Sequence, residues 1–272
     1  MIPKIIHLCW LSGDEFPRDI RVCLESWKEI LGGYEIWLWG KKPENCLGLN
    51  IIEKPFDLDS VIWCRQAFEA KKYAFAADYI RVYAVYNYGG IYMDSDVMMY
   101  KPFDDLLDLP YFLGEDAVHC FEPAIFGAEK GCPWVKDVLD WYDGRLYTNP
   151  DGTTGQTGLP VVFHQSLCPK YRFVLSKRDD AYTYTDDVIR IFPKEYFNSR
   201  NYIKPIRTRE SYCSHHFVGS WLKTKKQKDL KDVLKAIVPE GVLNIVYAFM
   251  YHVRYKHVMK NVLIPFDKGL KG

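Results

Sequence analysis

The chain has 272 residues, which is enough for one large domain or for a domain with an appendage. Its 48% apolar and 26% charged residues are ordinary values for a globular protein. The 8 cysteines are scattered without a C-x-x-C pair, which argues against a disulfide framework or a cysteine zinc site and indicates reduced thiols in a cytoplasmic protein. Because no apolar run reaches about 18 residues, we expect no membrane span.

The net charge of +1 hides an uneven distribution of charge along the chain. Residues 223–272 contain 11 Lys and Arg against 4 Asp and Glu, so residues 1–222 carry a net charge of about −6. A basic tail on an acidic body favours an anionic partner. We therefore expect a cytoplasmic protein that is either free or peripheral at the cytoplasmic membrane face through residues 223–272, with no nucleic-acid partner.

The first elements predict a βαβ unit. Residues 4–10 form a short apolar run rich in β-formers, and residues 34–39 form a second one. Between them, residues 17–31 have apolar side chains at helical spacing after a proline and before Gly32-Gly33. Strand, helix and strand within this length predict a parallel sheet.

The longest helical stretch covers residues 60–88, with a break expected near Tyr73. A double glycine ends it, three strand residues follow, and then come Asp94 and Asp96. In an extended chain these two side chains would share one side, and a turn at the strand end can aim both into one space. Two carboxylates at that place suit a hard divalent cation that also holds phosphate oxygens.

Asp78 and Arg81, three residues apart, lie on one face of the predicted helix. Such a pair is often an exposed ion pair of small energetic value. Here the neighbouring alanines favour burial or close approach of another group.

The rest of the chain is predicted to be mixed α/β. Strands are expected at residues 97–100, 111–115, 124–128 and 188–192, and helices at residues 133–141, 161–167 and 226–238. The segment SYCSHHFVGSW, residues 211–221, contains paired histidines that can supply a nitrogen ligand to a metal. Neither a P-loop nor a G-x-G-x-x-G sequence occurs, which excludes those two phosphate-binding motifs.

Four segments, IPKIIHLCW, AFAADYIRVYAVYNYGGIYMDSDV, IRIFPKEYF and HHFVGSW, together resemble glycosyltransferase family 32 in the family's order. The resemblance covers most of residues 1–222. It implies an α/β fold of the GT-A type, with a Rossmann-like, mostly parallel central sheet flanked by helices. Residues 1–222 would form the catalytic domain, and residues 223–272 a basic helical extension packed on that domain or on a membrane surface.

The resemblance also implies roles for particular residues. Asp78 and Arg81 would grip the donor sugar and its phosphate, Asp94 would lie between donor and metal, and Asp96 would bind Mn²⁺ or Mg²⁺ directly. His215 or His216 would contact the metal or a phosphate. Ser220 and Trp221 would close on the diphosphate, and Trp10 would stack on the nucleobase. Ala77 stands where the family usually has a serine, so one hydrogen bond is in doubt.

The implied activity is a retaining, metal-dependent transfer of a hexose or N-acetylhexosamine from a UDP- or GDP-sugar. The acceptor would be a glycan, in lipid-linked form, in polysaccharide or capsule biosynthesis. The acceptor can attack from the face of the leaving group, or a nucleophile can intervene, for which Glu115, Asp116, Glu122 or Gln165 are available. Two other functions are open: a catalytically silent GT-A module that binds a glycan or partner, and a sugar-phosphate nucleotidyltransferase.

Overall fold

The computed structural model describes residues 1–116, 119–178, 180, 187–197, 207–216, 242 and 262–267. Two predicted features fall outside these ranges. The amphipathic helix expected at residues 226–238 lies wholly outside them, as do Ser220 and Trp221.

The centre of the molecule is a sheet of six strands in the order β3-β2-β1-β4-β7-β6. Four neighbouring strands are parallel, which confirms the predicted parallel sheet: β3 (Ile51–Lys54), β2 (Glu35–Gly40), β1 (Ile5–Trp10) and β4 (Gly90–Met93). The other two are β7 (Phe121–Ala128), antiparallel to β4, and β6 (Tyr111–Glu115), antiparallel to β7. The sheet is therefore mostly parallel, and its antiparallel strand β7 lies directly beside β4, the strand that the two aspartates follow.

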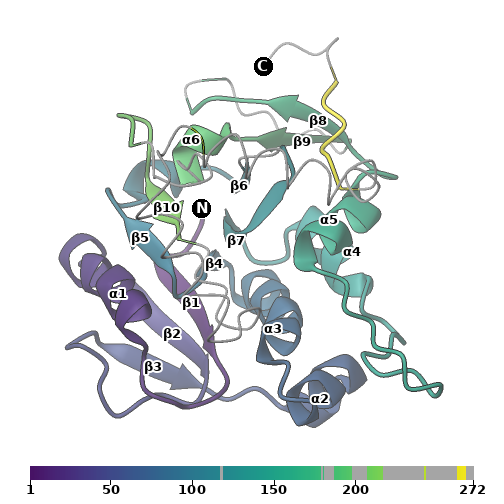
Figure 1. The fold of residues 1–272 in the computed structure, drawn as a ribbon. Coiled ribbons are helices and arrows are strands. Elements are labelled where there is room, and N and C mark those ends of the chain that lie inside the picture. The colour runs from purple at the N-terminus through teal and green to yellow at the C-terminus, as the bar shows by residue number, and fades with distance from the viewer. Residues whose placement is uncertain are drawn as a thin grey trace.

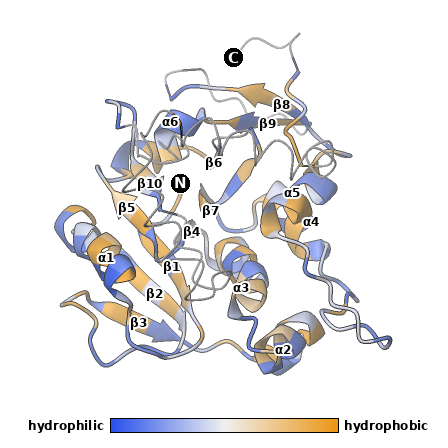
Figure 2. Ribbon diagram, viewed as in Figure 1, coloured by the Kyte–Doolittle hydropathy of each residue, from blue (hydrophilic) through white to orange (hydrophobic). Residues whose placement is uncertain are grey.

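Helices cover both faces of this sheet (Figure 1). On one face α1 (Arg18–Ile30) packs on apolar side chains of β1 and β2, including Ile6, Leu8 and Leu38. On the other face lie α2 (Ile62–Glu69), α3 (Tyr73–Tyr88), α4 (Pro133–Asp140) and α5 (Leu159–Leu167). The alternation of side chains along β1 explains the two layers, because Ile6 and Leu8 point to α1 whereas Cys9 packs towards α3. Figure 2 shows hydrophobic residues concentrated along the central strands.

Two small two-stranded sheets flank the central one. In the first, β5 (Val97–Met99) pairs antiparallel with β10 (Cys213–His215). In the second, β8 (Arg172–Leu175) pairs parallel with β9 (Val188–Ile191), and α6 (Lys194–Phe197) follows. Short 3-10 turns occur at Leu58–Ser60 and Asp104–Leu106. The β5–β10 ribbon matters most for function, since it joins the segment after the aspartates to the segment with the histidines.

Most predicted elements are present, with a few differences. The helical stretch at residues 60–88 is divided at Tyr73, as expected, into α2 and α3. The sequence did not predict β3, β8 or β10, which are only three or four residues long and gain their stability from neighbouring strands. The short helix α6 was likewise not predicted.

The end of the described chain returns to the body of the domain. Leu263 pairs with Cys120, and Phe266 pairs with Phe173. Ile264 is 5% exposed and belongs to the apolar core under α3 to α5. The division of the chain at residue 222 stays a prediction. None of the helices in the described part of the chain combines the length and apolar character that crossing a bilayer requires.

Candidate active site

The double glycine after α3 places the strand of the aspartates. Gly89 and Gly90 both have positive φ, at 66° and 104°, and a Cβ on Gly90 would stand 2.8 Å from the carbonyl oxygen of Ile5. Only glycine fits that combination of backbone conformation and close approach. His7 on β1 fixes the same turn, because its Nε2 lies 2.7 Å from the carbonyl oxygen of Gly89. The chain therefore enters β4 beside the centre of the sheet.

Asp94 and Asp96 lie in a turn directly after β4. The Asp94 N–H donates to the Ala124 carbonyl at 2.9 Å, and the Val97 N–H donates back to the Asp94 carbonyl at 3.1 Å. Helix α1 holds the strand that follows, since the Trp27 indole donates to the Val97 carbonyl at 2.7 Å. Hydrogen bonds to β7 and to α1 thus fix the turn, and the two carboxylates lie close together.

A histidine from the far end of the chain joins the two aspartates. In the β5–β10 ribbon His215 lies opposite Val97, which sets its side chain beside Asp96. Its Nε2 is 3.4 Å from Asp96 Oδ1. One ligand atom each from Asp94, Asp96 and His215 lie within 4.8 Å of one another. Two carboxylates and an imidazole at this separation form a donor set that can bind a divalent metal ion.

Glu122, at the second position of β7, lies on the other side of His215. Its Oε1 is 3.3 Å from His215 Nδ1 and also accepts a hydrogen bond from the Ala124 N–H at 3.2 Å. The Glu122 side chain is 3% exposed. A buried carboxylate against the second nitrogen of a histidine fixes the orientation of the ring, as is common around metal-binding histidines.

Asp78 and Arg81 form a buried ion pair next to this group. Arg81 Nη2 is 3.0 Å from Asp78 Oδ1, and Arg81 Nη1 is 3.1 Å from Asp94 Oδ1. Nη1 also donates to the Pro123 carbonyl at 3.2 Å, and the guanidinium lies over the Tyr92 ring at 4.4 Å. The Arg81 side chain is 8% exposed, so the burial expected from the neighbouring alanines is present. Arg81 therefore connects α3 to the aspartate turn.

Tyr92 completes the support of Asp94. Its hydroxyl donates to Asp94 Oδ1 at 2.6 Å, and its ring faces Arg81. With Arg81 and Tyr92 behind it, Asp94 still exposes 25% of its side chain. It is therefore the more accessible of the two carboxylates that Arg81 holds.

For each of these groups, burial and the neighbouring charges have opposite effects on the pKa. Burial raises the pKa of Asp78 to about 7 even though Arg81 lowers it, and burial likewise raises the pKa of Asp94 against Arg81. For His215, burial alone would lower the pKa, but Asp96 and Glu122 outweigh burial and hold the pKa well above its ordinary value. The site thus stabilises positive charge at the place where His215 meets the carboxylates.

The two histidines that the sequence left open have different surroundings. Because successive residues of a strand point to opposite sides, His215 faces the aspartates whereas the His216 imidazole lies 3.8 Å from Cys23 Sγ on α1. The backbone N–H of His216 donates to the Asp96 carbonyl at 2.9 Å. His216 therefore supports the turn through its backbone and is outside the three-residue donor set.

Trp10 lies at the end of β1, at the same edge of the sheet as Asp94. Its indole donates to the Asp14 carbonyl at 2.7 Å, and its ring packs 4.9 Å from that of Phe16. It is partly exposed. Stacking of Trp10 on a nucleobase stays a prediction, as do the roles of Ser220 and Trp221.

Comparison with known proteins identifies the segment that contains most of this site. Residues 17–113 match the family model described as "Glycosyltransferase sugar-binding region containing DXD motif". Over these residues the chain is similar to that family. The matched region includes Asp78, Arg81, Asp94 and Asp96, and the fold adds His215 and Glu122 from beyond it.

Two fungal proteins are similar to the chain. It is 27% identical over 139 residues to inositol phosphoceramide mannosyltransferase 3 of Schizosaccharomyces pombe, which is 51% of this chain and 36% of that protein. It is 26% identical over 172 residues to mannosyl phosphorylinositol ceramide synthase SUR1 of Saccharomyces cerevisiae, which is 61% of this chain and 42% of that protein. The chain therefore spans less than half the length of either relative.

A solved structure, described as PaToxG glycosyltransferase, has a TM-score of 0.49 to this fold at 22% sequence identity. The superposition covers 62% of this chain and 68% of that one.

The sequence analysis did not predict that Tyr92 and Glu122 contact the site. Tyr92 was read as a strand residue only, although its place two residues before Asp94 is the signal that puts both side chains on one side of an extended chain. Glu122 was named only as one of four candidate nucleophiles. No local pattern links it to His215, because the contact joins residues 93 positions apart.

Proposed function

We propose that this protein is a retaining, metal-dependent glycosyltransferase. It would transfer a hexose or N-acetylhexosamine from a UDP- or GDP-sugar to a glycan acceptor, in lipid-linked form, during polysaccharide biosynthesis. The observation that carries the proposal is the convergence of Asp94, Asp96 and His215 beside the buried Asp78–Arg81 pair, next to a segment similar to the glycosyltransferase family. The names of the fungal relatives, which state mannosyl transfer, support a sugar as the transferred group.

The donor set fits a divalent cation held by Asp94, Asp96 and His215. A mixed oxygen and nitrogen set favours Mn²⁺ over Mg²⁺, which prefers oxygen ligands alone. When bound, such an ion would neutralise the negative charge that develops on the diphosphate leaving group. Glu122 would keep the His215 ring turned so that Nε2 faces Asp96.

Arg81 would act mainly through Asp94. Its Nη atoms already contact Asp78, Asp94 and the Pro123 carbonyl, and its face is against Tyr92. It therefore orients the exposed part of Asp94 towards the donor and offsets the charge of two carboxylates. Within this proposal Asp94 is the residue that meets the donor, and Arg81 is a positioning residue.

The four candidate nucleophiles are each engaged by protein groups. Glu115 contacts His119 at 2.7 Å, Asp116 accepts from the Cys120 N–H, Glu122 contacts His215, and Gln165 accepts from the Trp141 indole. This favours attack of the acceptor from the face of the leaving group, with the departing phosphate oxygen taking the acceptor's proton. Retention is tested by ¹H NMR of the first-formed product, in which an inverted anomeric configuration would contradict the proposal.

The transfer itself is tested by incubating purified protein with Mn²⁺ and a panel of UDP- and GDP-sugars, and measuring release of the nucleotide. We expect release from one donor, a loss of at least a hundredfold in Asp96→Asn, and no change in Asp108→Asn, which removes an exposed carboxylate outside the site. Absence of release from every donor would overturn the proposal, as would equal rates for wild type and Asp96→Asn.

The alternative functions have their own signatures. A silent GT-A module would bind glycan in a calorimeter without metal and would not bind nucleotide. A sugar-phosphate nucleotidyltransferase would release pyrophosphate from a nucleoside triphosphate and a sugar 1-phosphate. Either result would replace glycosyl transfer as the function.

We also propose that the basic residues beyond position 222 bring the protein to an anionic membrane, where a lipid-linked acceptor resides. The charge of residues 223–272 supports this proposal. Full-length protein with Lys225, Lys226 and Lys228 changed to Gln would bind acidic liposomes less in a flotation assay. Equal flotation of wild type and variant would remove the idea.

A further inference from the structure

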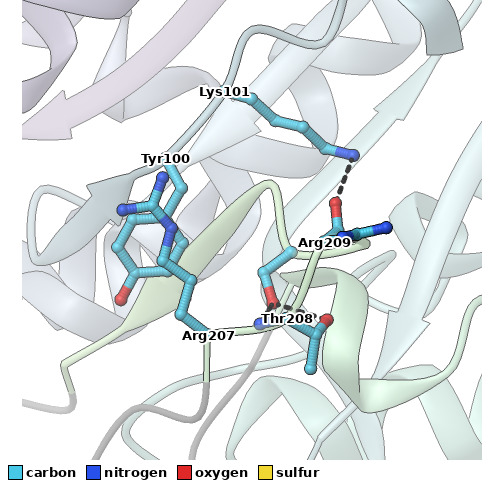
Figure 3. Close-up of a pocket in the computed structure, with 6 residues that line it drawn as sticks. Tyr100, Lys101, Arg207, Thr208 and Arg209 are labelled. Carbon is cyan, nitrogen blue, oxygen red and sulfur yellow. Dashed lines mark hydrogen bonds between the residues drawn. The ribbon is translucent and has the colours of Figure 1, made fainter.

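A polar pocket lies at the opposite end of the β5–β10 ribbon from Asp96 and His215 (Figure 3). Its volume is about 580 Å³, and its lining consists of Tyr100, Lys101, Arg207, Thr208, Arg209 and Ser211. From Asp96 to Tyr100 the extended chain covers about 13 Å. The pocket is therefore separate from the metal-binding donor set although both lie on one ribbon.

Two of the three cationic side chains of this pocket lie over aromatic rings. The Arg207 guanidinium lies 4.8 Å from the centre of the Tyr100 ring, and Figure 3 shows it across that ring. Lys101 Nζ lies 3.8 Å from the centre of the Tyr212 ring and donates to the Arg209 carbonyl at 3.3 Å. A cation over a ring face keeps most of its N–H donors free for another partner.

The backbone between these cations is fixed by hydroxyl groups. The Thr208 N–H donates to Ser211 Oγ at 3.0 Å, and the Glu210 N–H donates to Thr208 Oγ1 at 3.2 Å. Ser211 is buried and donates in turn to the Glu195 carbonyl at 2.8 Å. Because this turn is tied to α6, Arg207 and Arg209 stand on a defined support.

The charges of the pocket lack compensation within the described residues. There, none of Lys101, Arg207 and Arg209 makes an ion pair. Two other cations do form ion pairs: Arg178 Nη1 is 2.9 Å from Asp105, and Lys4 Nζ is 2.7 Å from Asp104. None of the described residues that line the pocket is an aspartate or a glutamate. Three neighbouring cations repel one another, and an anion placed among them would relieve that repulsion.

We propose that this pocket binds a phosphate group of a phosphorylated ligand. Arginine presents two N–H donors in a planar fork that matches two phosphate oxygens, and Lys101 adds a third cation. The inference rests on the pocket alone, so it stands whether or not the protein transfers a sugar.

The test measures binding of phosphates to full-length protein by isothermal titration calorimetry, with a chelator present so that no metal ion at Asp94 and Asp96 can hold them. The probes are inorganic phosphate and glycerol 3-phosphate. We expect saturable binding that weakens at least tenfold in Arg207→Gln/Arg209→Gln. The matched control is Arg18→Gln/Arg21→Gln, which removes the same charge from the exposed face of α1 and should leave binding unchanged.

A second arm distinguishes a free phosphate from a lipid headgroup. Wild type and both double variants are floated with phosphatidylcholine vesicles that contain or lack phosphatidic acid. Vesicle binding that the Arg207/Arg209 variant loses assigns a lipid phosphate, whereas binding of soluble phosphates alone assigns a free ligand. The proposal is overturned if the wild type binds no phosphate probe in either arm, or if the Arg207/Arg209 variant binds as the wild type does. Thermal melts that agree among the proteins establish that the variants are folded.

Discussion

Glu122 and His215 form a buried contact in which Glu122 Oε1 is 3.3 Å from Nδ1 of the ring, while Nε2 of the same ring faces Asp96 at 3.4 Å. The imidazole thus stands between a carboxylate of β7 and a carboxylate of the aspartate turn. Because the two nitrogens have different partners, the ring cannot flip without losing both contacts. Glu122 is accordingly a positioning residue whose effect reaches the donor set through His215.

From this contact we expect Glu122→Gln to weaken Mn²⁺ binding by about tenfold to a hundredfold, the usual effect of losing a carboxylate behind a metal-binding histidine. Binding is measured from the free Mn²⁺ signal in electron paramagnetic resonance, which requires no turnover. Glu25→Gln, on the exposed face of α1, is the control and should bind Mn²⁺ as the wild type does. Unchanged affinity in Glu122→Gln would show that Glu122 has no part in the site.

The Tyr92 hydroxyl should contribute to stability through Asp94, to which it donates at 2.6 Å. Tyr92→Phe keeps the ring under Arg81 but removes a hydrogen bond to the carboxylate of Asp94, which is expected to reduce the free energy of unfolding by about 1–3 kcal/mol. Urea unfolding measures the change. Tyr73→Phe at the start of α3, where the ring contacts Phe68 at 5.3 Å, should change it by less than about 0.5 kcal/mol. Equal effects of the two substitutions would contradict this role of the hydroxyl.

The aspartate turn and its helix could be predicted because their signals are local. The double glycine, the apolar strand and the two aspartates occupy adjacent positions, and the alanines around Asp78 indicate burial of its face. The same is true of β1, α1 and β2, where periodicity and glycines define the ends. The observed bounds of these elements are close to the predicted ones.

The choice between His215 and His216 could not be made from the sequence. It depends on the register in which His215 pairs with Val97, more than a hundred residues earlier in the chain. A shift of one residue would exchange the two side chains. The contact of Glu122 with His215 and the cationic pocket at residues 207–211 likewise depend on where β10 joins β5, and no local pattern encodes that position.

Removal of the Arg81 guanidinium should be strongly destabilising. Arg81→Met would leave the buried Asp78 and the partly exposed Asp94 without the cation that lies between them, and removal of one partner of a buried ion pair typically reduces the free energy of unfolding by about 3–5 kcal/mol. Urea unfolding at pH 7 measures it. Arg65→Met is the control, since Arg65 and Asp59 are exposed and 3.9 Å apart, and a loss below about 1 kcal/mol is expected. Adding Asp78→Asn to Arg81→Met should recover part of the loss, and no recovery would argue against the charge-based account.

His7 should make the stability of the protein depend on pH in the acidic range. Its Nδ1 accepts from the Trp39 indole at 3.1 Å and its Nε2 faces the Gly89 carbonyl at 2.7 Å, which fixes the neutral ring, and burial lowers its pKa from 6.5 to about 4. Between these two values the unfolded chain binds more protons than the folded one, so the stabilisation is complete above pH 6.5 and is lost as the pH falls through about 4. In His7→Gln this titration is absent, while the other ionisable groups remain the same. The difference in free energy of unfolding between wild type and His7→Gln should therefore decrease by about 3 kcal/mol as the pH falls from 6.5 to 4. Chemical unfolding at several pH values measures this difference, and a difference that stays constant across the range would show that His7 is not held neutral by the fold.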